Sequence, residues 1–307
     1  MPLIAKLPLN KSFADTYGTY PTHLNVLGRK KNAVQRQIRR GGLGSYEIDF
    51  QSTLLALCET STTRIRFFDV GAHMGLYSAL VSCIFRSQNP YIVAIEPTPD
   101  TARDAHRLRR ANGLKYKVIE VAVSDVEGEA ELYLSEKTES SNSLNPEFRP
   151  HSESLRVPLT TIDRLVEDGL RSPTILKVDV ETFEANVVRG AMATIEKSRP
   201  VVTLELLPDA DLTAVKDALG AMEELGYQFY RVGPTPVWEP HSVEDAMGLV
   251  SEDHRDWVCS PSPLTDEFFA ARVAWQDALS LCGRATNVLV DRGTPVADVV
   301  WGKVGHR

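Results

Sequence analysis

Short apolar segments alternate with segments of helical periodicity through most of this 307-residue chain. Residues 65–70 and 91–96 have the composition of buried strands, and residues 74–85 between them carry apolar side chains at helical spacing. Two strands separated by a helix of this length indicate parallel pairing with a right-handed crossover, because parallel strands need a long connection. The alternation therefore predicts an α/β fold with a doubly wound, mostly parallel sheet of seven strands.

The rest of the chain continues this pattern with two additions. We expect the further strands of the sheet at residues 116–123, 174–180, 201–206, 227–232 and 285–290. We expect further helices at residues 98–112, 183–196 and 211–225. Residues 130–134 and 156–160 alternate polar with apolar side chains, which predicts an edge hairpin with a loop rich in Ser and Asn. Residues 233–284 are irregular in sequence, which indicates an insert before the last strand.

These expectations divide the chain into an N-terminal extension (1–44), a main domain (45–291) and a C-terminal tail (292–307). A basic helix is expected in the extension, with these side chains close together: Arg29, Lys30, Lys31, Arg36, Arg39 and Arg40. Such a group is either a solvated helical face or a lid that attracts an anionic substrate. The insert contains Trp238, Trp257 and Trp275, which indicate packing of that segment or a platform for a sugar ring.

The charge balance opposes several classes of partner. A net charge of −7 opposes general binding to a nucleic-acid backbone, which requires a basic face. The sequence contains no stretch of 18 apolar residues that would span a membrane, and its first residues lack the pattern of a secretory signal. The four cysteines lie far apart, without the spacing of a disulfide framework or a zinc ribbon. We therefore expect a cytoplasmic protein.

Acidic residues stand at the carboxyl ends of four expected strands: Asp69, Glu96, Asp179 and Glu205. Ligands of doubly wound sheets bind at this edge. After Asp69, the turn contains Gly71 and Gly75, but His73 replaces the middle glycine that a dinucleotide-binding loop has. A carboxylate next to this turn suits a cationic amino-acid group better than a pyrophosphate. The turn therefore favours S-adenosylmethionine as the ligand.

Two further acids fit an adenosine. Glu96, 25 residues after Gly71, is placed to accept hydrogen bonds from both ribose hydroxyls, a feature that NAD-binding enzymes share. Asp125 is placed to meet the adenine amino group, and its alternative role is that of a turn residue before Gly128.

Lys177 and Asp179 fall on the same face of an expected central strand. A lysine buried there requires a nearby carboxylate, such as Asp179 or Glu205. One interpretation is a buried ion pair that holds the strand to a helix. The other is an acid–base cluster beside the group that is transferred.

Several segments together form a recognisable pattern: 44–47, 68–75, 96–97, 122–125, 143–144, 161–163, 176–184, 190–191, 199–200, Glu205 and 287–290. With these segments the chain resembles the FkbM-type methyltransferases, which use S-adenosylmethionine, over roughly residues 43–291. The segment 176–184 is the most distinctive part of the likeness. The family usually has Asn where His73 stands and Gly where Thr182 stands, so the turn after the strand is expected to differ.

The resemblance implies a Rossmann-like class I methyltransferase that methylates an oxygen atom of a sugar, glycan or natural product. A hydroxyl is a weak nucleophile, so we expect Asp179 to orient or deprotonate it, Lys177 to tune Asp179, and Glu205 and Glu184 to assist. The expected cofactor contacts are Asp69, Gly71, Ala72, His73, Gly75, Ser78, Glu96, Pro97, Ser124 and Asp125. Two strand-end carboxylates also suit Mg²⁺, but the sequence indicates no third ligand, so a metal is not favoured.

Two alternatives remain open at the level of sequence. A nucleotide-dependent oxidoreductase would use NAD on a similar sheet, although the glycine pattern and Asp69 oppose it. A binding module without catalytic activity would share the fold, but its expected signature, the loss of a cofactor acid or a glycine, is not seen. The sequence does not specify the acceptor or the oligomeric state.

Overall fold

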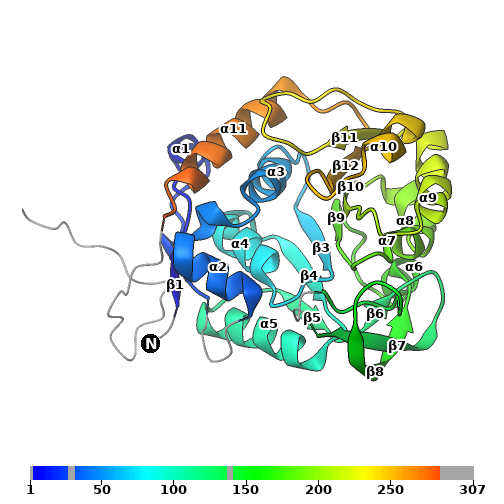
Figure 1. The fold of residues 1–307 in the computed structure, drawn as a ribbon. Helices are drawn as coiled ribbons and strands as arrows, with labels where there is room; N and C mark the ends of the chain where they lie inside the picture. The colour runs from blue at the N-terminus through cyan, green and yellow to red at the C-terminus, as the bar shows by residue number, and fades with distance from the viewer. Residues whose placement is uncertain (1–2, 27–31, 137–140, 284–307) are drawn as a thin grey trace, which may run out of the picture.

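A seven-stranded sheet forms the centre of the part of the chain that the computed structural model describes, residues 3–26, 32–136 and 141–283 (Figure 1). Its strand order is β11-β12-β10-β9-β3-β4-β5. All neighbours pair in parallel except β12, which is antiparallel to β10 and β11. The strands are β3 (Arg66–Val70), β4 (Tyr91–Ile95), β5 (Lys117–Ile119), β9 (Ile175–Val178), β10 (Val201–Glu205), β11 (Gln228–Arg231) and β12 (Asp256–Ser260). The predicted mostly parallel, doubly wound sheet is confirmed.

Helices cover both faces of this sheet. One face packs against α1 (Lys11–Tyr17), α2 (Ala33–Gly41), α3 (Ile48–Glu59), α4 (Leu76–Ile84), α5 (Pro99–Ala111) and α11 (Asp266–Ser280). The other packs against α6 (Ile162–Glu167), α7 (Glu184–Arg189), α8 (Met192–Ser198), α9 (Leu212–Glu224) and α10 (Val243–Leu249). Successive strand residues point to opposite faces, so Phe67 belongs to the first core cluster and Phe68 to the second.

The expected helix over residues 183–196 is two helices, α7 and α8, because Gly190 separates them. A Cβ atom at Gly190 would lie 1.9 Å from the carbonyl oxygen of Ser124, so only glycine permits this close approach. The expected strand over residues 116–123 is also divided, into β5 and β6 (Ala122–Val123). The continuous apolar pattern of this segment does not reveal where the chain leaves the main sheet.

The expected edge hairpin is present as β7 (Gly128–Ser135) and β8 (His151–Thr160), which pair antiparallel. It does not extend the edge of the main sheet, contrary to the prediction. β6 pairs in parallel with β8 instead, so the hairpin belongs to a separate three-stranded sheet of order β6-β8-β7. The reason is the break after β5, which releases β6 to a second layer.

The segment expected to be irregular is not, because residues 233–283 contain α10, β12 and α11. β12 is inserted between β10 and β11, and Trp257, Val258 and Cys259 are fully buried there. Packing on both faces of the sheet stabilises this five-residue strand, in which Trp257 and Val258 also favour strand conformation. Trp238 and Trp275 are also buried, so packing is confirmed as their role. The strand expected at residues 285–290 and the tail at 292–307 lie outside the described residues.

The N-terminal extension packs against the first face of the sheet. It contains a two-stranded sheet of β1 (Ile4–Lys6) and β2 (His23–Asn25), and α2 buries Val34 and Ile38. The side chains of Arg36, Arg39 and Arg40 on α2 are exposed, as for a solvated face, whereas Arg29, Lys30 and Lys31 lie outside the described residues. Two short 3₁₀ helices, η1 (Leu43–Ser45) and η2 (Arg86–Gln88), complete the elements.

Two findings bear on the environment of the protein. No helix in the described ranges is long and apolar enough to cross a membrane. All four cysteines are buried and free.

Candidate active site

A cavity of about 300 Å³ lies at the carboxyl ends of the central parallel strands. The strand ends contribute Gly71, Glu96, Asp179 and Glu205 to its wall. Ligands of doubly wound sheets bind at this edge, so the cavity is the candidate active site. Other segments also contribute to the wall, among them α2, residues 46–47 before α3, residues 121–123 and the loop 141–149.

The turn after β3 brings the backbone close to this cavity. Gly71 has φ +71°, and a Cβ atom there would lie 1.7 Å from the carbonyl oxygen of Asp179. The amides of Gly71 and Ala72 both donate to the carbonyl of Ile95, at 3.0 Å each. His73 has φ +51°, a region that Asn and His tolerate better than most residues. The turn therefore requires glycine at 71 and accepts His73 in place of the family's usual Asn.

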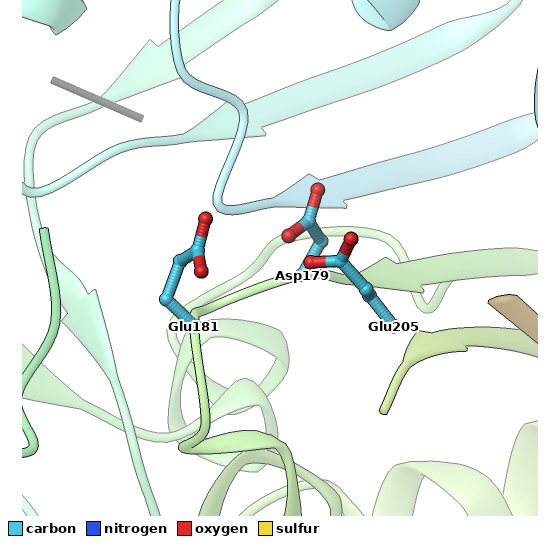
Figure 2. Close-up of side chains that lie close together, drawn as sticks. All are labelled: Asp179, Glu181 and Glu205. Carbon is cyan, nitrogen blue, oxygen red and sulfur yellow. The ribbon is translucent and has the colours of Figure 1, made fainter. Parts of the chain in front are cut away.

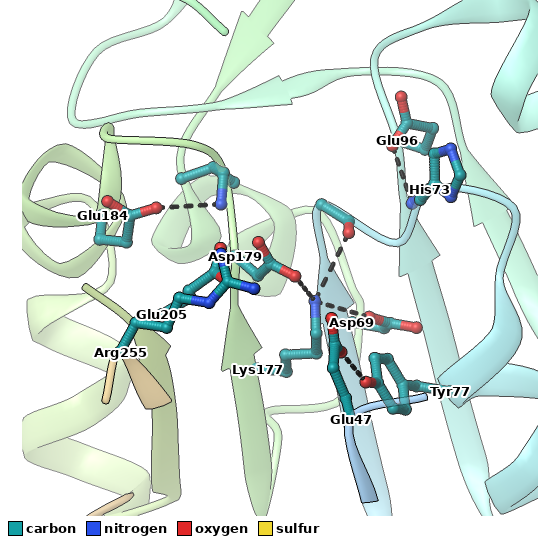
Figure 3. A network of polar contacts seen from close by, with 12 residues as sticks. Glu47, Asp69, His73, Tyr77, Glu96, Lys177, Asp179, Glu184, Glu205 and Arg255 are labelled. Carbon is teal, nitrogen blue, oxygen red and sulfur yellow. Dashed lines mark hydrogen bonds and ion pairs between the residues drawn. The ribbon is translucent and has the colours of Figure 1, made fainter. Parts of the chain in front are cut away.

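Glu96 lies at one end of the cavity, and two backbone amides fix its carboxylate. The amide of His73 donates to Oε2 and the amide of Thr98 to Oε1, each at 2.9 Å (Figure 3). Burial raises the pKa of Glu96, and the hydrogen bonds from Thr98 and His73 oppose that rise. Pro97 also lines the wall. Glu96 is therefore placed where the sequence predicts a ribose contact, although the contact itself stays a prediction.

An apolar wall flanks Glu96. It consists of Ile95, Val121, Ala122, Val123 and Leu132. These side chains offer a dry surface for a flat ring such as adenine.

Asp69 is not part of the cavity wall, and its expected contact with the cofactor stays a prediction. Its side chain is fully buried and accepts hydrogen bonds from the amide and the hydroxyl of Ser78, at 3.1 and 2.8 Å. Asp69 also lies beside Lys177 on the neighbouring strand, so its carboxylate faces that lysine. Ala72, Gly75 and Ser78 are likewise outside the cavity wall. Asp69 therefore anchors the start of α4 and pairs with Lys177.

Ser124 and Asp125 are also outside the cavity wall, and their expected contacts with the cofactor stay predictions. Asp125 accepts hydrogen bonds from Arg189 Nε at 2.9 Å, Asn186 Nδ2 at 3.1 Å and Ser124 Oγ at 3.0 Å. These contacts tie the segment after β6 to α7. The break between β5 and β6 places Val121–Val123, rather than Asp125, at the cavity.

Lys177 contacts three oxygen atoms at the junction of β3 and β9 (Figure 3). Its Nζ lies 3.0 Å from Asp179 Oδ2, 3.5 Å from Asp69 Oδ1 and 3.5 Å from the carbonyl oxygen of Gly71. Burial lowers the pKa of Lys177, but the carboxylates of Asp179 and Asp69 outweigh burial and raise it. Lys177 therefore stays protonated, and the predicted pairing with Asp179 is present.

Three carboxylates converge at the other end of the cavity (Figure 2). One oxygen atom each of Asp179, Glu181 and Glu205 lies within 4.8 Å of the others. Glu205 also forms an ion pair with Arg255, whose Nε lies 3.1 Å from Glu205 Oε1. Glu181 and Arg255 were not predicted as site residues, and they join Asp179 and Glu205 there. We refer to Asp179, Glu181 and Glu205 as the carboxylate cluster.

The pKa values of the three groups in the carboxylate cluster shift in different directions. Burial raises the pKa of Asp179, but Lys177 and a hydrogen bond from Glu205 lower it below its ordinary value. Burial and the charge of Asp179 raise the pKa of Glu205 well above its ordinary range, and they raise that of Glu181 to about 8. Asp179 is therefore ionised at neutral pH, whereas Glu181 retains most of its protons there.

Glu184 supports the turn after β9 and does not line the cavity. Its Oε1 accepts hydrogen bonds from the amides of Val180 and Thr182, at 3.1 and 3.2 Å. Burial raises the pKa of Glu184 to about 7. Glu181 and Thr182 have φ +58° and +78°, which costs roughly 1–3 kcal/mol for each non-glycine residue. The turn is therefore strained at both residues.

Sequence reasoning also missed Tyr46 and Glu47, which line the same cavity. The Tyr77 hydroxyl donates a hydrogen bond to the Glu47 carboxylate. Residues 44–47 carry part of the family resemblance, which was the available signal for them. Arg255 had no such signal, because it precedes β12 in the segment that was expected to be irregular.

Comparison with known proteins gives one family match and several similar structures. The family described as Methyltransferase FkbM domain matches residues 69–229. No curated protein matches the chain. The methyltransferase FkbM of Methylobacillus flagellatus KT is 16% identical, covers 68% of this chain and has a TM-score of 0.42. This chain spans 47% of that protein.

Two further solved structures are similar at lower identity. The precorrin-6y C5,15-methyltransferase of Geobacter metallireducens GS-15 is 12% identical, with 70% of this chain and 89% of that chain covered and a TM-score of 0.39. The plantazolicin methyltransferase BpumL, solved in complex with SAH, is 10% identical, with 71% and 87% covered and a TM-score of 0.36.

Proposed function

The chain belongs to the FkbM methyltransferase family, whose pattern matches 69–229 of its 307 residues, and we propose that it methylates a hydroxyl group of a sugar, glycan or other natural product. One observation carries this proposal. A single cavity joins Glu96 and the glycine turn at one end to Asp179 and its neighbours at the other. Such a cavity can hold a methyl donor beside a group that orients the acceptor.

The residues at the Glu96 end fit S-adenosylmethionine. The backbone at Gly71 lines the cavity, and the Glu96 carboxylate retains lone pairs for ribose hydroxyls. The apolar wall of residues 121–123 suits adenine, and His73 lines the same wall near the expected methionine carboxylate. When bound, S-adenosylmethionine supplies an electrophilic methyl group on a positively charged sulfur atom.

The carboxylate cluster would prepare the acceptor hydroxyl. Asp179 is ionised and held by Lys177, so it can accept a hydrogen bond from the hydroxyl and orient its oxygen. A general base works best when its pKa lies near the working pH, and the pKa of Glu181 is about 8. We therefore assign the orienting role to Asp179 and the acceptance of the proton to Glu181 in its ionised form, whose fraction grows as the pH rises towards 8.

A magnesium ion is the less favoured second route to the same activation. Glu181 supplies the third carboxylate that the sequence did not indicate, and Mg²⁺ prefers oxygen ligands. However, Lys177 and Arg255 already pair with Asp179 and Glu205. Activity that persists in EDTA supports the metal-free route, and loss of activity with recovery on adding Mg²⁺ supports the metal.

The proposed acceptor is a small molecule or a glycan rather than a nucleic acid, since the net charge of −7 opposes binding to phosphate backbones. The four free, buried cysteines are compatible with the reducing cytoplasm, which is our proposed location.

Calorimetry tests the cofactor assignment. We expect S-adenosylhomocysteine to bind and to raise the melting temperature, by the equivalent of about 2.7 kcal/mol at a hundredfold excess over its Kd. NADH should not bind. Binding of NADH without binding of S-adenosylhomocysteine would favour the oxidoreductase instead.

Transfer of a labelled methyl group to a panel of sugars and hydroxylated natural products tests the reaction. Methylated oxygen in the product, located by mass spectrometry and NMR, supports O-methylation. Cofactor binding without transfer to any member of a broad panel would favour the non-catalytic binding module.

A further inference from the structure

The loop 141–149 contacts both ends of the cavity. At the cofactor end, Asn142 Nδ2 lies 3.4 Å from Thr98 Oγ1, and the amide of Thr98 donates to the Glu96 carboxylate. At the other end, the hydroxyl of Ser143 donates to the carbonyl of Glu181 at 2.6 Å. Asn142, Ser143, Leu144 and Arg149 also line the cavity. The loop therefore bridges the two ends of the candidate active site.

A second contact joins this loop to the strained turn after β9. Asn145 Nδ2 donates a hydrogen bond to Thr182 Oγ1 at 3.1 Å. The backbone amide of Asn145 also donates to Ser143 Oγ at 3.0 Å, which connects the two loop residues whose side chains contact the turn. Glu184 holds the same turn from its buried side, through the amide of Thr182. The turn is thus held from two sides, by a buried carboxylate and by the loop.

Two successive left-handed residues determine where Glu181 points. Glu181 and Thr182 have φ +58° and +78°, and a β-branched residue rarely adopts such an angle. The Glu181 carboxylate lies close to those of Asp179 and Glu205 (Figure 2). Glycine would adopt the turn without strain, but it would lack the hydroxyl that Asn145 contacts. Compared with glycine, Thr182 therefore has a more strained backbone, but its hydroxyl forms a hydrogen bond with the loop.

We propose that Thr182 is a positioning residue, whose hydroxyl locks the loop 141–149 onto the turn and so holds the Glu181 carboxylate in the carboxylate cluster. The proposal rests on the proposed function only for the consequence that Glu181 takes part in methyl transfer. The locking itself is a property of the fold. Release of the loop would let the strained turn relax and carry Glu181 away from Asp179.

Hydrogen–deuterium exchange tests the lock without an assay of activity. We expect the amides of residues 141–149 to exchange roughly 3–10-fold faster in Thr182→Val and in Asn145→Ala, because each removes one hydrogen bond. Thr182→Ser keeps the hydroxyl and should exchange like the wild type. Thr213→Val, at an exposed position on α9, is the matched control for the loss of a threonine hydroxyl.

Thr182→Gly separates positioning from simple stability. Glycine relieves the strain, so the melting temperature should stay equal or rise, whereas the loop should exchange faster and kcat should fall. The double variant Thr182→Val with Asn145→Ala should match either single variant, because the two residues share one contact. Unchanged loop exchange in both single variants, or purely additive effects in the double variant, would overturn the proposal.

The pH profile gives a readout that a purely structural role would not move. The pKa of Glu181 is about 8 because burial and Asp179 raise it. If the lock holds Glu181 in place, the rising limb of kcat should move to lower pH in Thr182→Val, and Thr182→Ser should restore it. Calorimetry with S-adenosylhomocysteine separates the two levels: a wild type that does not bind it refutes the proposed function, whereas the exchange data judge the lock independently.

Discussion

The two ends of the cavity stabilise their buried carboxylates in different ways. At the cofactor end, each oxygen of the Glu96 carboxylate accepts a hydrogen bond from one backbone amide. At the acceptor end, Asp179, Glu181 and Glu205 lie together with Lys177 and Arg255 as their cations. Backbone hydrogen bonds give a fixed acceptor of hydrogen bonds, whereas crowded charges give groups that exchange protons near neutral pH. The first arrangement suits binding and the second suits chemistry.

Asp179→Asn should have the largest effect, a loss of kcat without a loss of cofactor affinity. The change keeps the volume of the side chain but removes the charge that orients the acceptor hydroxyl. We expect kcat to fall roughly 10²–10⁴-fold, while the affinity for S-adenosylhomocysteine changes little. Steady-state kinetics on an identified acceptor and calorimetry measure the two quantities. The exposed Asp217→Asn on α9 is the control, and a wild-type kcat in Asp179→Asn would make Asp179 structural.

Lys177→Met should affect folding more than cofactor binding. The variant leaves Asp69 and Asp179 without the cation between them, and Asp69 is fully buried. Removal of one partner from a buried ion pair costs about 3–5 kcal/mol. Urea denaturation should show this loss, and Lys197→Met, at an exposed position on α8, should not. A loss below about 1 kcal/mol, the range of surface pairs, would show that Lys177 is not essential to the fold.

Glu96→Ala should weaken binding at the opposite end. The carboxylate is expected to accept charge-assisted hydrogen bonds from the ribose hydroxyls, each worth roughly 1.5–3 kcal/mol. We expect the affinity for S-adenosylhomocysteine to fall at least tenfold, or about 1.4 kcal/mol, with an unchanged circular dichroism spectrum. Calorimetry measures the affinity. Unchanged affinity would show that Glu96 serves only to hold the amides of His73 and Thr98.

The sequence predicts those parts of the site that depend on regular strand geometry. Lys177 and Asp179 share a face because strand side chains repeat every two residues, and the structure places them in contact. Glu96 and Glu205 stand at strand ends, and the ends of the apolar segments in the sequence are sufficient to locate them. In each case a local rule of spacing is sufficient.

The sequence does not predict the parts that depend on irregular backbone or on distant packing. Glu181 reaches the cavity because two residues adopt left-handed angles, which neither side chain favours. Arg255 precedes β12, which pairs with β10 on one side and β11 on the other and buries Trp257. Asp125 contacts Asn186 and Arg189 of α7, and the chain leaves the main sheet between β5 and β6. Each of these outcomes is set by tertiary contacts rather than by local pattern.

The smallest expected effect concerns stability against pH, and it tests whether Glu181 belongs to the crowded end. Its pKa of about 8 lies above the ordinary value of a glutamate, because burial and Asp179 disfavour its charge. The folded state therefore binds a proton that the unfolded state has already released between about pH 5 and pH 8. Stability from this group is complete below the ordinary pKa and is lost as the pH rises through the folded pKa.

Urea denaturation between about pH 5.5 and pH 8.5 measures this dependence. The wild type should lose free energy of unfolding as the pH rises, with a contribution from Asp256, whose pKa burial and Glu47 raise to about 8. Glu181→Gln, which carries no titrating proton, should lose less over the same range. Glu224→Gln on the exposed side of α9 should follow the wild type. If Glu181→Gln follows the wild type as well, the Glu181 carboxylate is solvated in solution and does not belong to the carboxylate cluster.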